Sequence, residues 1–344
     1  MRTLVQEAAA RDMYATVFAS LPRRDQRRRA EEYVQGLLRT PGRKSFRSIA
    51  QHTGGDSAAE QRLHHLVTGS TWDWRPVRTA LVEWLAATNP LSAWVVQPMP
   101  LPRNGERPCG TPRCRQSFGV WFVAPKAVTP VAWRLYLPDD DTVPEETYED
   151  AVTAAVLEAT GSALTPKRPV VLDVGGIDTP TALTHLPLAE LPMIARTRPA
   201  TPVRMADPAL PGYGAGTRTA RETLAAVTSL RRPVEWHDGA PAPSVSLAAA
   251  VPVTTPARRP ALLLGEWPDP RRPPANFWVT NMRLPAPVLL RLTKHTDRVT
   301  RTAATRARQT GLRDFAGRSL TGWHRHLTLA SVACAVAAFP PPGT

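Results

Sequence analysis

The chain has 344 residues, of which 42% are hydrophobic, so it can form one large domain or two ordinary domains with buried cores. Its formal net charge of +14 and its pI of about 10.8 favour a polyanionic partner such as DNA or RNA. The longest mostly apolar stretch, residues 327–339, is too short to span a bilayer and predicts a buried helix, so we expect no membrane association.

Cysteine usage predicts a reducing compartment. The chain has only Cys109, Cys114 and Cys334, and we find no signal peptide, so we expect a cytoplasmic protein. Four residues separate Cys109 from Cys114, as in half of a zinc site. No Cys/His pair at ligand spacing lies nearby, and we therefore expect no zinc.

The first 90 residues predict an all-α region. One helical face recurs at the spacing of a buried stripe and comprises Ala30, Tyr33, Val34, Leu37 and Leu38. Further helices are predicted at residues 45–52, 57–67 and 76–87. The arginines at residues 23–29 fall in the first turns of a helix, where positive charge does not stabilise it. Their presence favours a partner, and we interpret residues 1–90 as a DNA-binding region.

A mixed α/β sheet is predicted next, over residues 91–186. Short apolar runs predict buried strands at residues 93–96, 117–123, 128–137 and 169–174. A helical pattern at residues 148–159 lies between the last two of these strands. Strands with an intervening helix are typical of a mixed sheet.

Residues 187–280 are rich in proline and predict a β-rich insertion with long loops. Strands are predicted at residues 244–253 and 261–264, followed by an exposed loop at residues 265–276 and a resumed apolar pattern at residues 277–280. Residues 281–344 are predicted to be mainly helical and basic. Residues 283–326 contain ten arginines and lysines against only Asp297 and Asp314.

Four segments together resemble the DDE transposases of bacterial insertion sequences, from about residue 18 to residue 339. They are FASLPRRDQRRRAEEYVQGLL (18–38), LHHLVTGSTWDWRPVR (63–78), WRLYLP (133–138) and FAGRSLTGWHRHLTL (315–329). The resemblance implies an RNase H-like mixed sheet. Its first part would be residues 91–186 and its C-terminal part residues 281–344, with residues 187–280 inserted between them.

In that family three carboxylates hold two Mg²⁺ ions, which activate the attacking oxygen and stabilise the leaving oxygen. The resemblance puts a pair of aspartates after the strand at residues 93–96, where this chain has Gln97 and Pro98. It makes Asp173, in PVVLDVGG, the relic of the second acid. The residue pattern alone is equally compatible with an aspartate that bonds the backbone of the next turn.

The third acid of the family is a glutamate, which the resemblance puts just before a Gly-Arg-Ser segment. Here Ala316 stands at that place, and Asp314, two residues earlier, is the nearest substitute. On a helix, residues two apart lie on different faces, so Asp314 is a poor replacement. The resemblance therefore leaves one acid of three.

These observations predict a catalytically inactive, transposase-derived protein that binds double-stranded DNA, acts as a transcriptional regulator, needs no cofactor and associates with the nucleoid. Active relatives work on paired DNA ends, so the resemblance also implies a homodimer. The residues expected to contact DNA are Arg23, Arg24, Arg27, Arg28, Arg43, Lys44, Arg298, Arg301, Arg306, Arg308, Arg318, His324 and Arg325.

Two alternatives remain open at this point. One is an active transposase or endonuclease that uses Mg²⁺ with an atypical acid set, for example Asp173 with Asp314. The other is a decaying gene product with a stable fold. Random decay would damage core positions as well, whereas here the core patterns are intact and the replacements fall at the acids.

Overall fold

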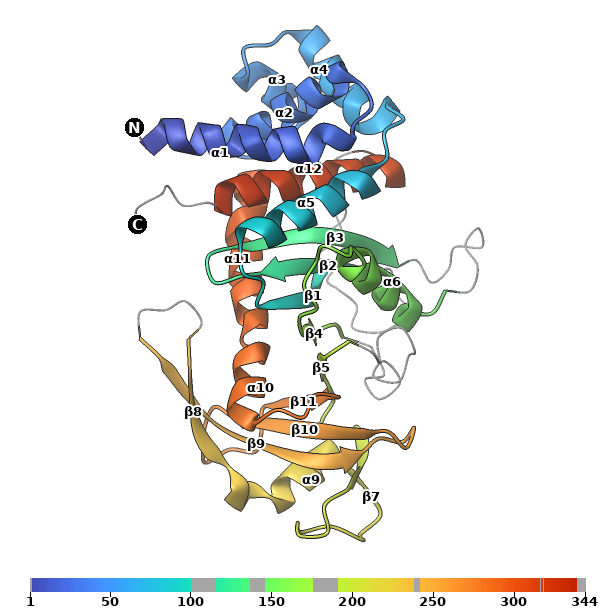
Figure 1. Ribbon diagram of the computed structural model, residues 1–344, viewed down its shortest axis with the longest axis vertical. Coiled ribbons are helices and arrows are strands. Elements are labelled where there is room, and N and C mark those ends of the chain that lie inside the picture. The colour runs from blue at the N-terminus through green and yellow to red at the C-terminus, as the bar shows by residue number, and fades with distance from the viewer. Residues whose placement is uncertain are drawn as a thin grey trace.

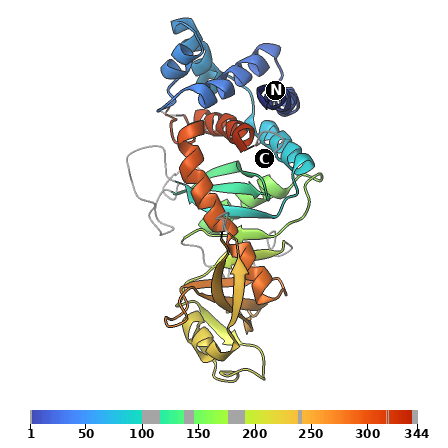
Figure 2. The ribbon, with the colours of Figure 1, turned by 90° about the vertical axis from the view of Figure 1, so that its left-hand side faces the viewer.

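The computed structural model describes residues 2–99, 116–136, 146–175, 191–237, 242–315, 317 and 319–338. The molecule is elongated, with a cluster of helices at one end, a sheet in the middle and a β-rich part at the other end (Figure 1). A column formed by two consecutive helices, α10 (Ala286–Thr293) and α11 (His295–Thr310), links the β-rich end to the helical end (Figures 1 and 2).

The first part of the chain is helical, as predicted, and its helices gather at one end of the molecule (Figure 1). They are α1 (Arg2–Val17), η1 (Phe18–Ser20), α2 (Arg24–Arg39), α3 (Phe46–His52), α4 (Ser57–His64), η2 (His65–Gly69) and α5 (Trp74–Thr88). Side-chain oxygens of Ser45, Asp56 and Asp73 accept backbone N–H groups at the starts of α3, α4 and α5. The predicted stripe of α2 faces inward: Ala30, Tyr33, Val34 and Leu37 are buried, and Leu38 packs against the core.

The middle of the molecule is an RNase H-like sheet. Its strands are β1 (Ala93–Met99), β2 (Gln116–Val123), β3 (Val128–Tyr136), β4 (Val170–Leu172) and β5 (Met193–Arg196). Their order is β3-β2-β1-β4-β5, with β1, β2 and β3 antiparallel and with β4 and β5 parallel to β1. The four strands predicted for this region are confirmed, although β1 extends to Met99.

The β-rich end continues the same sheet. Its strands are β6 (Pro202–Met205), β7 (Thr217–Thr219), β8 (Arg232–Trp236), β9 (Ser244–Thr254), β10 (Pro260–Trp267) and β11 (Asn276–Thr280), with short helices α9 (Ala220–Ala226) and η3 (Thr228–Leu230). Strand β11 pairs antiparallel with β5, which makes one sheet of 11 strands. Residues 187–280 are thus β-rich as predicted, but β5 and β11 join them directly to the core sheet.

Two further helices cover the sheet. α6 (Tyr148–Thr160) contacts β2 and β3, and α12 (Leu320–Ala338) contacts β3, α2 and α5. The buried indole of Trp133 on β3 donates to Ser331 Oγ of α12 at 3.1 Å. The apolar stretch predicted to be a buried helix is therefore the part of α12 that joins the helical end to the sheet.

Candidate functional site

Gln97 and Asp173 lie side by side at the ends of parallel strands. The Asp173 N–H donates to Val96 O at 2.9 Å, which aligns the residue after β4 with β1. The Gln97 side chain is buried, and its Nε2 lies 3.4 Å from Asp173 Oδ2. The resemblance to DDE transposases implied this pair, since it put Gln97 and Asp173 at the positions of the family's first and second acids.

Arg196, the last residue of β5, donates hydrogen bonds to both oxygens of the Asp173 carboxylate. Its Nε donates to Oδ1, and its Nη2 donates to Oδ2 at 3.2 Å. The guanidinium also stacks on the indole of Trp278, 4.4 Å from the ring centroid. Bidentate pairs of this kind are among the stronger hydrogen bonds in proteins. Arg196 is not among the residues predicted from the sequence, because β5 was not predicted.

Helix α11 supplies the third side of this site. Gln97 Nε2 donates to Thr296 O at 3.1 Å and to Thr300 Oγ1 at 3.3 Å. The acid nearest to this contact on α11 is Asp297, which is half-buried. Burial raises the pKa of Asp297, while Lys294, Arg196 and Arg301 act in the opposite direction.

The segment predicted to carry the third acid lies elsewhere. Ala316 is outside the described residues. Asp314 Oδ2 accepts the Lys44 N–H at 2.9 Å, beside the connection between α2 and α3. At about 1.5 Å per residue, Gly311 is roughly 16 Å along the helix axis from Thr300. The structure therefore does not bring Asp314 together with Asp173, because α11 separates them.

A polar network connects the site to the β-rich end. Arg196 Nη1 donates to Asn276 Oδ1 at 2.8 Å, and Asn276 Nδ2 donates to Glu266 Oε2 at 2.9 Å. Glu266, only 1% exposed, pairs with Lys294 Nζ at 2.5 Å. Asp173 and Glu266 thus have separate cationic partners. Within the described ranges, no group of three His, Cys, Asp or Glu side chains could hold a metal ion.

The arginines of α2 remain on the surface. Arg23, Arg24 and Arg28 are exposed, and so is Arg43 after the helix. Arg27 is half-buried, and its Nε donates to Leu21 O at 2.8 Å. Arg28 lies 3.4 Å from Glu32 in an exposed i,i+4 pair, which leaves it available to solvent ions.

Three other predicted DNA contacts turn inward. Lys44 is buried, and its burial lowers its pKa. Arg325 is buried and donates to Trp72 O at 3.0 Å. His324 stacks on Trp74 with 4.7 Å between ring centroids, and Arg78 Nη2 lies 3.1 Å from its Nδ1. Burial is the main cause that lowers the pKa of His324 to about 3, and the charge of the neighbouring Arg78 acts in the same direction. These side chains hold α12 and its neighbours together, so they do not form part of a basic surface.

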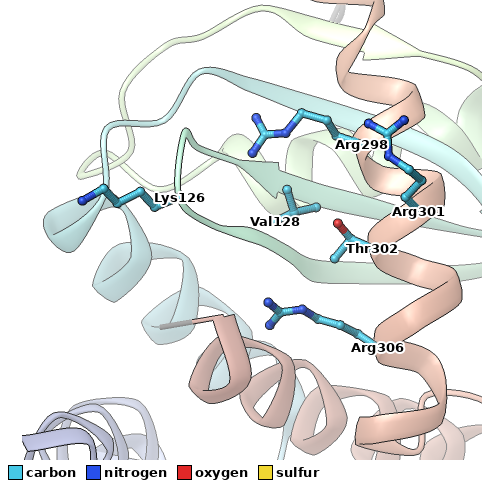
Figure 3. Close-up of a pocket in the computed structure, with 6 residues that line it drawn as sticks. All are labelled: Lys126, Val128, Arg298, Arg301, Thr302 and Arg306. Atoms are coloured by element: carbon cyan, nitrogen blue, oxygen red, sulfur yellow. The ribbon is translucent and has the colours of Figure 1, made fainter. Parts of the chain in front are cut away.

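The basic residues of α11 lie beside the β2–β3 turn. Arg301 and Arg308 are exposed, whereas Arg298 and Arg306 are half-buried. The predicted contact Arg318 is outside the described residues, as are Cys109 and Cys114. Arg298, Arg301 and Arg306 line a pocket with Lys126 of the turn (Figure 3). Sequence reasoning missed Lys126, since no local pattern places this turn next to α11.

In the part of the chain that the structure describes, no helix is long and apolar enough to cross a membrane. No curated protein matches the chain. The family described as DDE superfamily endonuclease matches residues 16–248, which is more than half of the chain. This match covers the helices from η1 to α5, the RNase H-like strands and the Gln97–Asp173 pair, and the chain therefore belongs to the DDE superfamily endonuclease family.

Proposed function

We propose that this protein is a catalytically inactive member of its family that binds double-stranded DNA and acts as a transcriptional regulator. The observation that carries the proposal is the bidentate pair between Arg196 and Asp173. The carboxylate that a divalent cation would need already neutralises a guanidinium of the same chain.

The donor set at the site does not fit two Mg²⁺ ions. Gln97 offers an amide, Thr300 a hydroxyl and Asp173 the one carboxylate of the three. Mg²⁺ binds mainly through charged oxygens in near-octahedral geometry, and a two-metal centre needs carboxylates shared between the ions. We infer that Thr300, which contacts Gln97, occupies the place where the third acid of a working site would stand. We therefore expect no metal cofactor.

DNA binding is supported by the family and by the placement of charge. An endonuclease family acts on nucleic acid, and this chain keeps exposed arginines on α2 and α11. Cations grouped on particular elements suit contacts to backbone phosphates, and such contacts persist without the acids. A homodimer remains a prediction from the resemblance.

The test measures binding and cleavage on the same samples. Purified protein is titrated into duplex fragments from its genomic neighbourhood, with Mg²⁺ or Mn²⁺ present, and the DNA is then resolved on a denaturing gel. We expect specific binding that weakens steeply with salt, and intact strands. Lack of binding to any fragment in preference to random DNA would refute the regulatory role.

The second candidate is a metal-dependent nuclease with an atypical acid set. In this candidate Asp297, rather than Asp314, acts together with Asp173. The charge of Arg196, the partner of Asp173, acts to lower the pKa of Asp297, which supports the choice of Asp297 over Asp314. Nicking that is abolished by Asp173→Asn and Asp297→Asn, and retained by the control Asp269→Asn in the exposed β10–β11 connection, would establish this candidate and overturn inactivity.

A further inference from the structure

A small, strongly basic pocket lies between α11 and the turn that joins β2 to β3. Its volume is about 170 Å³, and it is lined by Lys126, Val128, Arg298, Arg301, Thr302 and Arg306. Figure 3 shows the side chains of Arg298 and Arg306 extending from α11 over the strand that carries Val128. The pocket is separate from the Gln97–Asp173 pair, since they share no lining residue.

The lining of the pocket is mainly cationic. Four of its six lining residues are cations, and none is an acid. Arg298, Thr302 and Arg306 follow at intervals of four residues and so share one face of α11. Burial lowers the pKa of Arg298, and the neighbouring charge of Arg301 lowers it further. Cations held together in this way are stabilised by an anion among them.

Two of the cations are fixed in place by backbone carbonyls. Arg298 Nη2 donates to Ala124 O and to Pro125 O, each at 3.0 Å. Arg306 Nη1 donates to Cys334 O at 2.9 Å. A guanidinium has five N–H donors, so each arginine keeps further donors for a ligand. Because the forks are already oriented, binding an anion costs little side-chain entropy.

The size and lining of the pocket identify the chemical class of its ligand. Pockets for drug-sized molecules usually measure about 300–1,000 Å³ and are mainly apolar. This pocket is smaller, and Val128 is its only apolar lining residue. Tetrahedral oxyanions such as phosphate match both its volume and its donors.

We propose that this pocket binds one backbone phosphate of duplex DNA, a proposal that rests on the proposed DNA-binding function. The half-buried Arg298 and Arg306 form its inner part, whereas Lys126 and Arg301 are exposed. Exposed cations beside a small basic pocket suit a phosphate that belongs to a larger polyanion. A free phosphate ion would use the same inner donors, so the experiment separates the two sources.

The test replaces the exposed cations Lys126 and Arg301 and leaves the inner arginines, Arg298 and Arg306, unchanged. The variants are Lys126→Gln, Arg301→Gln and the double variant, with Arg301→Lys as the charge-preserving form. Arg204→Gln and Arg271→Gln, alone and combined, are controls, because both arginines are exposed at the β-rich end. Equal melting temperatures verify that each variant folds. Log Kobs for duplex DNA is then measured against log salt concentration.

We expect the double variant to bind duplex DNA about tenfold more weakly near 0.1 M salt and to lose about one unit of the salt slope, as for one lost phosphate contact. Arg301→Lys should keep most of the slope, and the control pair should change it little. If the pocket variants and the control variants had the same salt slope, the proposal that this pocket binds a backbone phosphate would be refuted, while the proposed DNA binding would stand.

A second measurement separates the pocket from the proposed function. Pyrophosphate is added to the wild-type protein and to the double variant, and melting temperatures are recorded. If the wild type bound no duplex, the proposed function would fail. A melting temperature raised by pyrophosphate in both proteins, whose inner arginines are intact, would then assign the pocket to free phosphate and overturn the DNA source.

Discussion

Asp173 retains its carboxylate, but its chemical surroundings differ from those of a metal ligand. Arg196 satisfies both of its oxygens, and Gln97 Nε2 lies 3.4 Å from one of them. The pair is only partly screened by solvent, with 36% of the Arg196 side chain and 20% of the Asp173 side chain exposed. Removing either partner leaves a partly buried charge without its counterion, which is more costly than losing an exposed pair.

A double-mutant cycle tests this interpretation. Asp173→Asn and Arg196→Gln should each lower the free energy of unfolding by about 1–3 kcal/mol, and the double variant should lose less than their sum. Urea denaturation of the four proteins gives the coupling energy. The exposed Asp269–Arg272 pair is the control and should show little coupling. Additive losses at Asp173 and Arg196 would mean that the pair does not stabilise the fold.

Buried histidines predict a pH dependence of stability. Burial lowers the pKa of His295 and His326 to about 4 and that of His324 to about 3. The unfolded chain binds these protons near pH 6.5, whereas the folded chain does not. The contribution of these histidines to the free energy of unfolding is therefore fully present above pH 6.5. It falls as the pH drops toward 4, by up to about 1.4 kcal/mol per pH unit for each histidine.

The measurement is the free energy of unfolding between pH 7.5 and pH 4.5. His326→Gln should reduce the slope by about a third, because three histidines contribute to it. The exposed His52 provides the control, and His52→Gln should leave the slope unchanged. A slope unaffected by His326→Gln would show that this ring has the same pKa in the folded and the unfolded chain.

The C-terminal end of α11 is where the helical column contacts the helical end of the molecule. Gly311 follows α11 with φ +71°, the left-handed conformation common at helix C-termini. Its carbonyl lies 2.8 Å from His326 Nε2, and the other ring nitrogen lies 2.8 Å from Tyr33 Oη. One buried ring thus connects α11, α12 and α2.

Gly311→Ala should destabilise the protein by about 2–4 kcal/mol, because it adds a steric clash to backbone strain. A Cβ at this position would lie 2.8 Å from Lys44 Cγ. Gly214 has a similar φ of +78° with nothing within 4 Å of an added Cβ, so Gly214→Ala should cost only about 1 kcal/mol. Thermal denaturation compares the two variants, and equal losses would exclude a packing role for Gly311.

Over the whole molecule, the sheet and the polar network cross from the RNase H-like strands into the β-rich end. β11 pairs with β5, and Asn276 joins Arg196 to Glu266. Helix α12 ties the other end of the sheet to α2 and α5. Continuous hydrogen bonding of this kind favours joint unfolding of the parts over independent domains.

Hydrogen exchange tests that expectation. The most protected amides of β1 and of β10 should report the same free energy of opening, since neither strand can open without losing the sheet between them. Lys294→Met leaves the buried Glu266 without its cation and should lower both values together, by about 3–5 kcal/mol. A loss confined to β10 would show that the β-rich end unfolds as a separate unit.

The sequence alone determined the elements and part of the site. Helical periodicity predicted the α2 stripe, because it records which face of the helix is inside, and short apolar runs predicted β1 to β4, because these strands are buried. The resemblance to DDE transposases put Gln97 and Asp173 at the positions of the family's first and second acids. Tertiary structure alone decided that Arg196 pairs with Asp173, that Thr300 contacts Gln97, and that Arg325 points inward. Gln97 and its partner Thr296 are 199 residues apart, and no local periodicity records a contact made only when distant elements pack together.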